Sequence, residues 1–416
     1  MNRRYVAAFA VCVPLAIGCA FLAWRIFTLG AADHWAIAAP ARALSWRSNA
    51  PDALDQAAED QFAAGHLLPA QRLAKLAIAA YPLDGTGYRV LARIADRTGD
   101  GRRALQLFWI AAIRSSRDAS VHATLADDAL KAGDIDAALR QFDLLMQLAP
   151  STQPDVLPRL VALAESPAVD PALIRMLAKQ PPWRGQFLWT LAGQGRDPAT
   201  VARIFRALQA AGSTALSVQE RQYWIGRQIG DHDWSSAHAQ WASTVPVAQR
   251  SALGNLFDGN FEFAADGNGF GWRITPVAGA EVRTAALPAG GTGNALTIEF
   301  TGMRTPATGI AQLLALTPGH YLLHGRAQAI DLDSERGLQW ALLCAEGQQQ
   351  TLMTTPALTG NQPWRAFATP FEVPEQQCGG QWLRLEVAPP YRIGGRAAYA
   401  NLGVDRISAA AAPNPP

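Results

Sequence analysis

Residues 51–152 read PDALDQAAEDQFAAGHLLPAQRLAKLAIAAYPLDGTGYRVLARIADRTGDGRRALQLFWIAAIRSSRDASVHATLADDALKAGDIDAALRQFDLLMQLAPST, and one pattern repeats three times along this stretch. Gly65, Gly99 and Gly133 lie 34 residues apart. The same step separates three further sets of positions: Ala70, Ala104 and Ala138; Ala77, Ala111 and Leu145; and Pro82, Ser116 and Pro150. A period of 34 residues predicts stacked pairs of antiparallel helices.

The residue types at the repeated positions fit such helix pairs. Each Gly separates two apolar-periodic segments and can end the first helix in a left-handed conformation. Asp100 and Asp134 follow directly and can cap the second helix. The stretch therefore resembles tetratricopeptide repeats, although the first helix of the first unit is weakly apolar. The alternative is an array of helical hairpins without the tetratricopeptide curvature.

Helical patterning continues through residues 153–250 without the strict period. Helices are expected at 155–165, 171–179, 183–192, 198–211, 217–229 and 234–243, because Pro or Gly interrupts the pattern between them. We interpret 153–250 as degenerate repeats that extend the α-solenoid.

The first helices of such repeats line a concave groove. The repeat register places these charged residues along it: Asp52, Asp55, Glu59, Arg89, Arg93, Arg97, Asp127 and Lys131. The three Arg are spaced by four residues and share one helix face, and guanidinium groups suit carboxylates or phosphates. The pattern predicts a protein partner with an acidic segment. In the alternative, these Arg pair with the acidic residues of the groove.

The N-terminus predicts a membrane anchor. Residues 5–24 carry no charge after MNRR, which is long enough to cross a bilayer. We assign 1–30 to an uncleaved transmembrane helix and 31–50 to a linker; a cleaved signal peptide and a lipoprotein modified at Cys19 are the alternatives. Arg3 and Arg4 favour a cytoplasmic N-terminus, and Arg25 opposes it. The expected location is a bacterial inner membrane, spanned once, with the bulk of the chain in the periplasm.

Composition changes near residue 251. Short β-rich runs separated by Gly and Pro follow, at 271–276, 280–285, 294–300, 310–315, 319–329, 338–345, 364–373, 382–387 and 404–408. This spacing predicts an antiparallel β-sandwich over 251–410. Residues 411–416 are expected to form a disordered tail.

Three segments of this part resemble galactose-binding-like jelly-roll domains, which include several carbohydrate-binding modules. They are NLFDGNFEFAADGNGFGWRI at 255–274, GNQPWRAFATPFEVP at 360–374 and YANLGVDRIS at 399–408. The resemblance implies a structural calcium ion held by Glu262 and Asp405; a salt bridge or a capping role is the alternative. No other cofactor is expected.

Two further pairs stand out in the sandwich. Cys344 and Cys378 would form a disulfide in an oxidising compartment, with buried free thiols as the alternative. Trp364, at the start of the run 364–373, and Tyr391 are expected to be borne by loops, and their flat rings are candidates for stacking on sugar.

Sequence features of enzymes are missing. The chain has no Gly-x-Ser-x-Gly, His-Glu-x-x-His or phosphate-loop motif, and its net charge of +2 does not favour nucleic acid. We therefore expect a non-enzymatic, membrane-anchored scaffold in exopolysaccharide or envelope assembly, with a protein partner in the solenoid and polysaccharide on the sandwich. The alternatives are a glycan-binding module on a helical stalk and a cryptic glycan-active enzyme.

Overall fold

A computed structural model describes residues 3–210, 216–287 and 293–408. The chain forms two compact units, Met1–Phe187 and Leu188–Pro416, which are described separately below. The expected tail at 411–416 lies outside the described residues.

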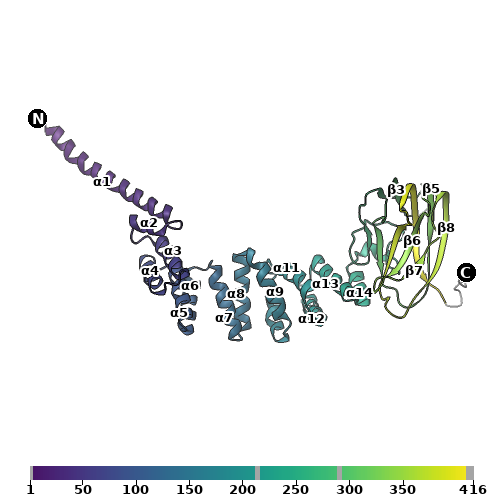
Figure 1. Cartoon of the computed structure of the whole chain (residues 1–416), viewed down its shortest axis with the longest axis horizontal. Helices are drawn as coiled ribbons and strands as arrows, with labels where there is room; N and C mark the ends of the chain where they lie inside the picture. The colour runs from purple at the N-terminus through teal and green to yellow at the C-terminus, as the bar shows by residue number, and fades with distance from the viewer. Residues whose placement is uncertain (1–2, 211–215, 288–292, 409–416) are drawn as a thin grey trace. The chain divides into compact units, whose positions relative to one another are not determined.

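The three predicted repeats are helix pairs in the first unit (Figure 1). Their helices are α3 (Pro51–Ala63) and α4 (Leu67–Ala80), α5 (Thr86–Arg97) and α6 (Gly101–Arg114), and α7 (Ala119–Lys131) and α8 (Ile135–Leu148).

The helix pairs are formed by the predicted Gly turns and Asp caps. Gly65, Gly99 and Gly133 have φ of 83°, 85° and 75°, which ends the first helix at no steric cost. The carboxylate of Asp100 accepts a hydrogen bond from the Arg103 N–H, and that of Asp134 from the Ala137 N–H. The helix-pair architecture is confirmed.

The N-terminal part of the first unit differs from the prediction. Helix α1 (Arg3–Trp35) runs past residue 30, and α2 (Pro40–Trp46) follows, so the expected linker at 31–50 is largely helical. Pro40 begins α2 because its missing N–H costs nothing in the first turn. Within the described residues, α1 is the one helix long and apolar enough to cross a bilayer, over Leu15–Trp35.

Helices continue to residue 252. They are η1 (Pro150–Thr152), α9 (Gln153–Ala164), η2 (Pro167–Val169), α10 (Asp170–Leu177), α11 (Arg184–Gln194), α12 (Pro198–Gln209), α13 (Val218–Gly230), α14 (Trp234–Thr244) and η4 (Val247–Ala252). The helical content predicted for 153–250 is therefore present, although the division into compact units falls inside α11.

Two antiparallel five-stranded sheets form the rest of the second unit (Figure 1). The first has the order β1 (Trp272–Ile274), β4 (Ile310–Leu314), β9 (Gln381–Val387), β6 (Leu338–Cys344) and β7 (Thr351–Thr354). The second has the order β2 (Ala280–Ala286), β3 (Asn294–Arg304), β10 (Arg392–Arg406), β5 (Gly319–Asp333) and β8 (Gly360–Val373). Alternate residues of both sheets form one apolar core, which includes Leu296, Leu323, Trp340 and Tyr399.

The last two helices pack on the sandwich. Trp234, Ala237 and Trp241 of α14 form one buried cluster with Phe270 and Leu313, which belong to the β-sandwich. The fit is tight, since a Cβ on Gly380 would lie 2.6 Å from the Trp234 ring. The α13–α14 pair is thus held on the sandwich by aromatic packing.

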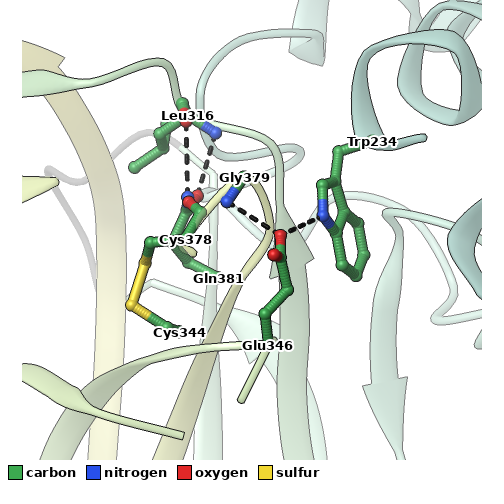
Figure 2. The surroundings of a disulfide bond; sticks show 7 residues. All are labelled: Trp234, Leu316, Cys344, Glu346, Cys378, Gly379 and Gln381. Atoms are coloured by element: carbon green, nitrogen blue, oxygen red, sulfur yellow. Dashed lines mark hydrogen bonds between the residues drawn. A yellow bond between two sulfur atoms is a disulfide. The ribbon is translucent and has the colours of Figure 1, made fainter. Parts of the chain in front are cut away.

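The disulfide lies beside this contact. Cys344 and Cys378 are bonded, as predicted for an oxidising compartment. Figure 2 shows Glu346, two residues after Cys344, accepting hydrogen bonds from the Trp234 indole N–H and from the Gly379 N–H. The disulfide therefore links the two segments that contact Trp234.

Truncating Trp241, a buried aromatic residue of this contact, should weaken the packing of α14 on the sandwich. Trp241→Ala is expected to lower the free energy of unfolding of the second unit by about 3–5 kcal/mol, as large buried aromatics do. Trp189→Ala is the matched control, because Trp189 is 54% exposed. Calorimetric unfolding of the full chain measures both, and equal effects would contradict the packing described.

Candidate functional site

A hollow of about 420 Å³ lies on the outer face of the second sheet. Residues from all five of its strands line it: Glu281, Arg283, Ala285, Ala286, Ala295, Thr297, Glu299, Gln328, Ile330, Trp364, Arg396 and Ala398. The hollow therefore crosses the strands instead of following one of them.

Strand alternation builds this surface. In β3, Leu296 and Ile298 point into the core, so Ala295 and Thr297, which alternate with them, lie on the outer side. Ala398 of β10 lies opposite Thr297 of β3 and Gln328 of β5. Small side chains at these central positions make the floor of the hollow.

Trp364 supplies the aromatic side of the hollow. It is half-buried within β8, so the predicted loop position of Trp364 is wrong. The Arg326 guanidinium lies 5.6 Å from the ring centre, and the indole N–H has no hydrogen-bond partner in the described structure. The Trp364 ring is thus held in place by its cation–π contact with Arg326 and by its position in the sheet.

Charged pairs line another part of the hollow. Arg283 and Glu281 are 2.7 Å apart, and Arg396 lies 3.7 Å from Glu299 across the β10–β3 pair. All four side chains are about half exposed or more, so they remain open to hydrogen bonding with a polar ligand. None of these residues was predicted from the sequence, although Glu299 lies between apolar Ile298 and Phe300 and so alternates with the core residues of this run.

Tyr391 is not part of this hollow. It lies in the loop before β10, where the Arg304 guanidinium is 5.1 Å from its ring centre. The structure therefore does not bring the two predicted sugar-stacking residues into one site.

A larger hollow, of about 570 Å³, lies between α12, α13 and α14. Its Arg227 is already engaged by Asp231 and by the carbonyl groups of Ala192 and Gly195. Its aromatic residue, Trp224, is buried and stacks on Phe205. This hollow offers no free flat ring, and we favour the sheet face as the candidate site.

The predicted groove residues of the helical repeats form an ion-pair network. Arg89 bonds Glu59 and Asp118, and Arg93 bonds the second oxygen of Glu59. Arg93 also lies 4.2 Å from the centre of the Phe62 ring. Arg89 and Arg93 therefore pair with acidic residues of the chain itself. For these two residues, this outcome agrees with the alternative in which the groove Arg pair with neighbouring carboxylates.

The remaining groove residues are more exposed. Arg97 lies 5.6 Å from the Phe62 ring centre, and Asp127 lies 3.6 Å from Arg159. Arg97 and Lys131 are exposed cations with no ion pair among the described residues.

Asp55 is not a groove residue, which corrects the prediction. It is 6% exposed and packs against Gly87 of α5, where the missing Cβ leaves it room. Burial, followed by repulsion from Asp84 and Asp52, raises the pKa of Asp55 to about 7. One of its carboxyl oxygens has no hydrogen-bond partner among the described residues.

Glu262 and Asp405, the predicted calcium ligands, have different surroundings in the structure. Asp405 is paired with Nε2 of His324 at 3.1 Å, and Glu262 is exposed. The described residues contain no group of three or more His, Cys, Asp or Glu side chains that could hold a metal. The loop is instead organised by buried Asp258, which accepts the N–H groups of Glu262 and Phe263. A structural calcium stays an untested prediction.

Comparisons with known proteins give structural similarities alone. No family model and no curated protein matches the chain. Among solved structures, "Family 16 Carbohydrate Binding Module-2" is 14% identical, with a TM-score of 0.27 over 37% of this chain and 100% of that one. The CBM22-1 xylan-binding domain from Paenibacillus barcinonensis Xyn10C is 16% identical, with a TM-score of 0.26 over 36% and 92%. Pseudomonas aeruginosa pilF is 14% identical, with a TM-score of 0.27 over 47% and 90%. At these values the similarities carry no information on function.

The buried carboxyl group makes the stability of the helical repeats depend on pH. The pKa of Asp55 is raised in the folded state, so the protein is more stable when this carboxyl is protonated. Its contribution to the free energy of unfolding is fully present below pH 4, the ordinary Asp range, and is lost as the pH rises to about 7. Asp55→Asn should remove this dependence and raise the free energy of unfolding most above pH 7. The scale is about 1.4 kcal/mol for each unit between the folded and unfolded pKa.

Thermal unfolding between pH 4 and 8 measures this effect. Asp60→Asn is the matched control, since Asp60 is also on α3 but is exposed. The same pH profile in both variants would contradict the assignment to Asp55.

Proposed function

We propose that this protein is a membrane-anchored, non-enzymatic scaffold whose β-sandwich binds glycan on the outer face of the second sheet. The observation that carries the proposal is the hollow that crosses all five strands, with Trp364 among its lining residues and an alanine floor. Exopolysaccharide or envelope assembly is the process in which we place it.

The chemistry of the hollow suits a carbohydrate chain. The face of an indole packs against the apolar face of a sugar ring. Carboxylates and guanidinium groups such as Glu281 and Arg396 can bond the hydroxyl groups around that ring.

The anchor and the disulfide support a location at the inner membrane with the bulk of the chain in the periplasm. Helix α1 supplies one candidate span. The Cys344–Cys378 bond indicates an oxidising compartment. Arg3 and Arg4 before the span favour a cytoplasmic N-terminus.

The helical repeats are proposed to hold a protein partner with an acidic segment. Arg97 and Lys131 are the exposed cations of the predicted groove. In the alternative function the helices are only a stalk for a glycan-binding sandwich. The first experiment below tests the glycan site, and the second distinguishes the scaffold from the stalk.

Removing the indole should weaken glycan binding. Trp364→Ala is expected to lower affinity for a bound polysaccharide about fivefold, since ring stacking is worth on the order of 1 kcal/mol. Binding of the full chain in detergent to a glycan array, followed by titration calorimetry, measures it. Tyr391→Ala is the control outside the hollow, and equal loss in both variants, or no saturable binding, would refute the site.

Reversing the exposed groove charges should release an acidic partner. The double variant Arg97→Glu, Lys131→Glu is expected to lose the partner in crosslinking from intact cells, because like charges then face each other. Arg102→Glu on α6 is the control, since Arg102 is exposed on the second helix of its repeat. Retention of every crosslinked protein by the double variant would leave the stalk as the function of the helices.

A further inference from the structure

The first unit begins with a hairpin of α1 and α2. The Phe27 and Trp46 ring centres are 5.6 Å apart, and the Arg42 guanidinium lies 4.2 Å from the centre of the Trp35 ring. Trp46 follows Arg42, whereas Phe27 precedes Trp35, so α2 runs back along α1. Trp24 stacks on Phe27 at 6.4 Å and extends the aromatic group.

Alanine packing fixes this hairpin to the repeats. One buried cluster joins both helices to α3, and its members are Ala32, Ala36, Ala43, Ala50 and Ala53. These small side chains let the helices approach closely, and partly buried Trp35 and Leu44 pack against the cluster. Helix α1 therefore enters the helical unit as a continuous element, and one side of its last turn is buried at Ala32.

The exposed apolar surface of α1 ends at a definite level. Leu15, Phe21 and Phe27 are 67%, 62% and 57% exposed, whereas Leu29 is half-buried and Ala32 is buried. Trp35 lies about 12 Å farther along the axis than Phe27, at 1.5 Å per residue. A bilayer that covers the exposed apolar residues would thus end near Phe27, which is the level of Trp46.

Cations lie at this level and beyond it. Arg25 on α1 is two residues before Phe27, and Arg47 directly follows Trp46. Arg42 on α2 reaches the Trp35 ring, farther along the axis. None of the three has a carboxylate partner among the residues that the structure describes; Arg47 donates to the Asn49 side chain. Trp and Arg side chains of this kind favour the headgroup layer of a membrane, where rings and phosphates are both within reach.

We infer that Trp24, Arg25, Phe27, Arg42, Trp46 and Arg47 form a lipid-binding face that lies in the headgroup layer and contacts anionic phospholipid phosphates. The inference rests on the membrane anchoring proposed above. It goes beyond an anchor because it makes α2 an interfacial helix that holds the first repeat at the bilayer surface.

Spin labels on the full chain test this face. The background carries Cys12→Ser and Cys19→Ser, so that the disulfide remains and each label has one site. Ile17→Cys reports the span, Ser48→Cys reports the region after α2, and Ser120→Cys on α7 is the aqueous control. The chain is reconstituted in nanodiscs of phosphatidylethanolamine and phosphatidylglycerol, and collision with oxygen and with a water-soluble nickel chelate gives the depth of each label.

The expected result is hydrocarbon depth for residue 17, headgroup depth for residue 48 and free aqueous access for residue 120. Adding Arg42→Gln and Arg47→Gln should raise nickel access at residue 48 severalfold toward that of residue 120. Aqueous access at residue 48 with residue 17 in hydrocarbon would overturn the lipid-binding face and leave the anchor. Aqueous access at residue 17 would overturn both, and unchanged access at residue 48 in the Gln variant would overturn the role of the cations.

Discussion

Close approach of helices at alanine is the constraint on which the helical part depends. Ala70, Ala104 and Ala138 are 0%, 3% and 0% exposed, and each lies in the second helix of a repeat. A larger side chain there would push the two helices of a pair apart. The same device recurs in the cluster that joins α1 and α2 to α3, so one packing rule extends from the repeats to the α1–α2 hairpin.

The repeat also explains where the charges go. Arg89 and Arg93 reach back to Glu59 because stacking brings residues about one period apart side by side. These pairs bridge neighbouring repeats in partly buried positions, where an unpaired charge would be costly. The groove is therefore less basic than its sequence indicates, and Arg97 and Lys131 are its exposed cations without an ion pair among the described residues.

The sequence predicted the fold better than the sites. The period of 34, the Gly–Asp turns and most strands were readable because each follows from local residue chemistry. Strand β7 was not predicted, and the run expected at 404–408 covers only the end of β10. The earlier part of β10 was missed because 394–400 is rich in Gly and Ala and resembles a loop. Asp55 was misplaced because its burial depends on Gly87 of the next repeat, a contact that a single helical face does not reveal.

The missed strand is the one that joins the fold to the candidate site. β10 lies at the centre of the second sheet, between β3 and β5, and its side chains alternate between two tasks. Tyr399 packs edge-on against Trp340 in the core, at 5.4 Å between ring centres, while Ala398 and Arg396 face the hollow. The small residues that hid β10 in the sequence are those that leave space on the outer face. A weak strand signal in the middle of a sandwich can thus mark the floor of a binding surface, because a ligand site needs side chains that do not fill it.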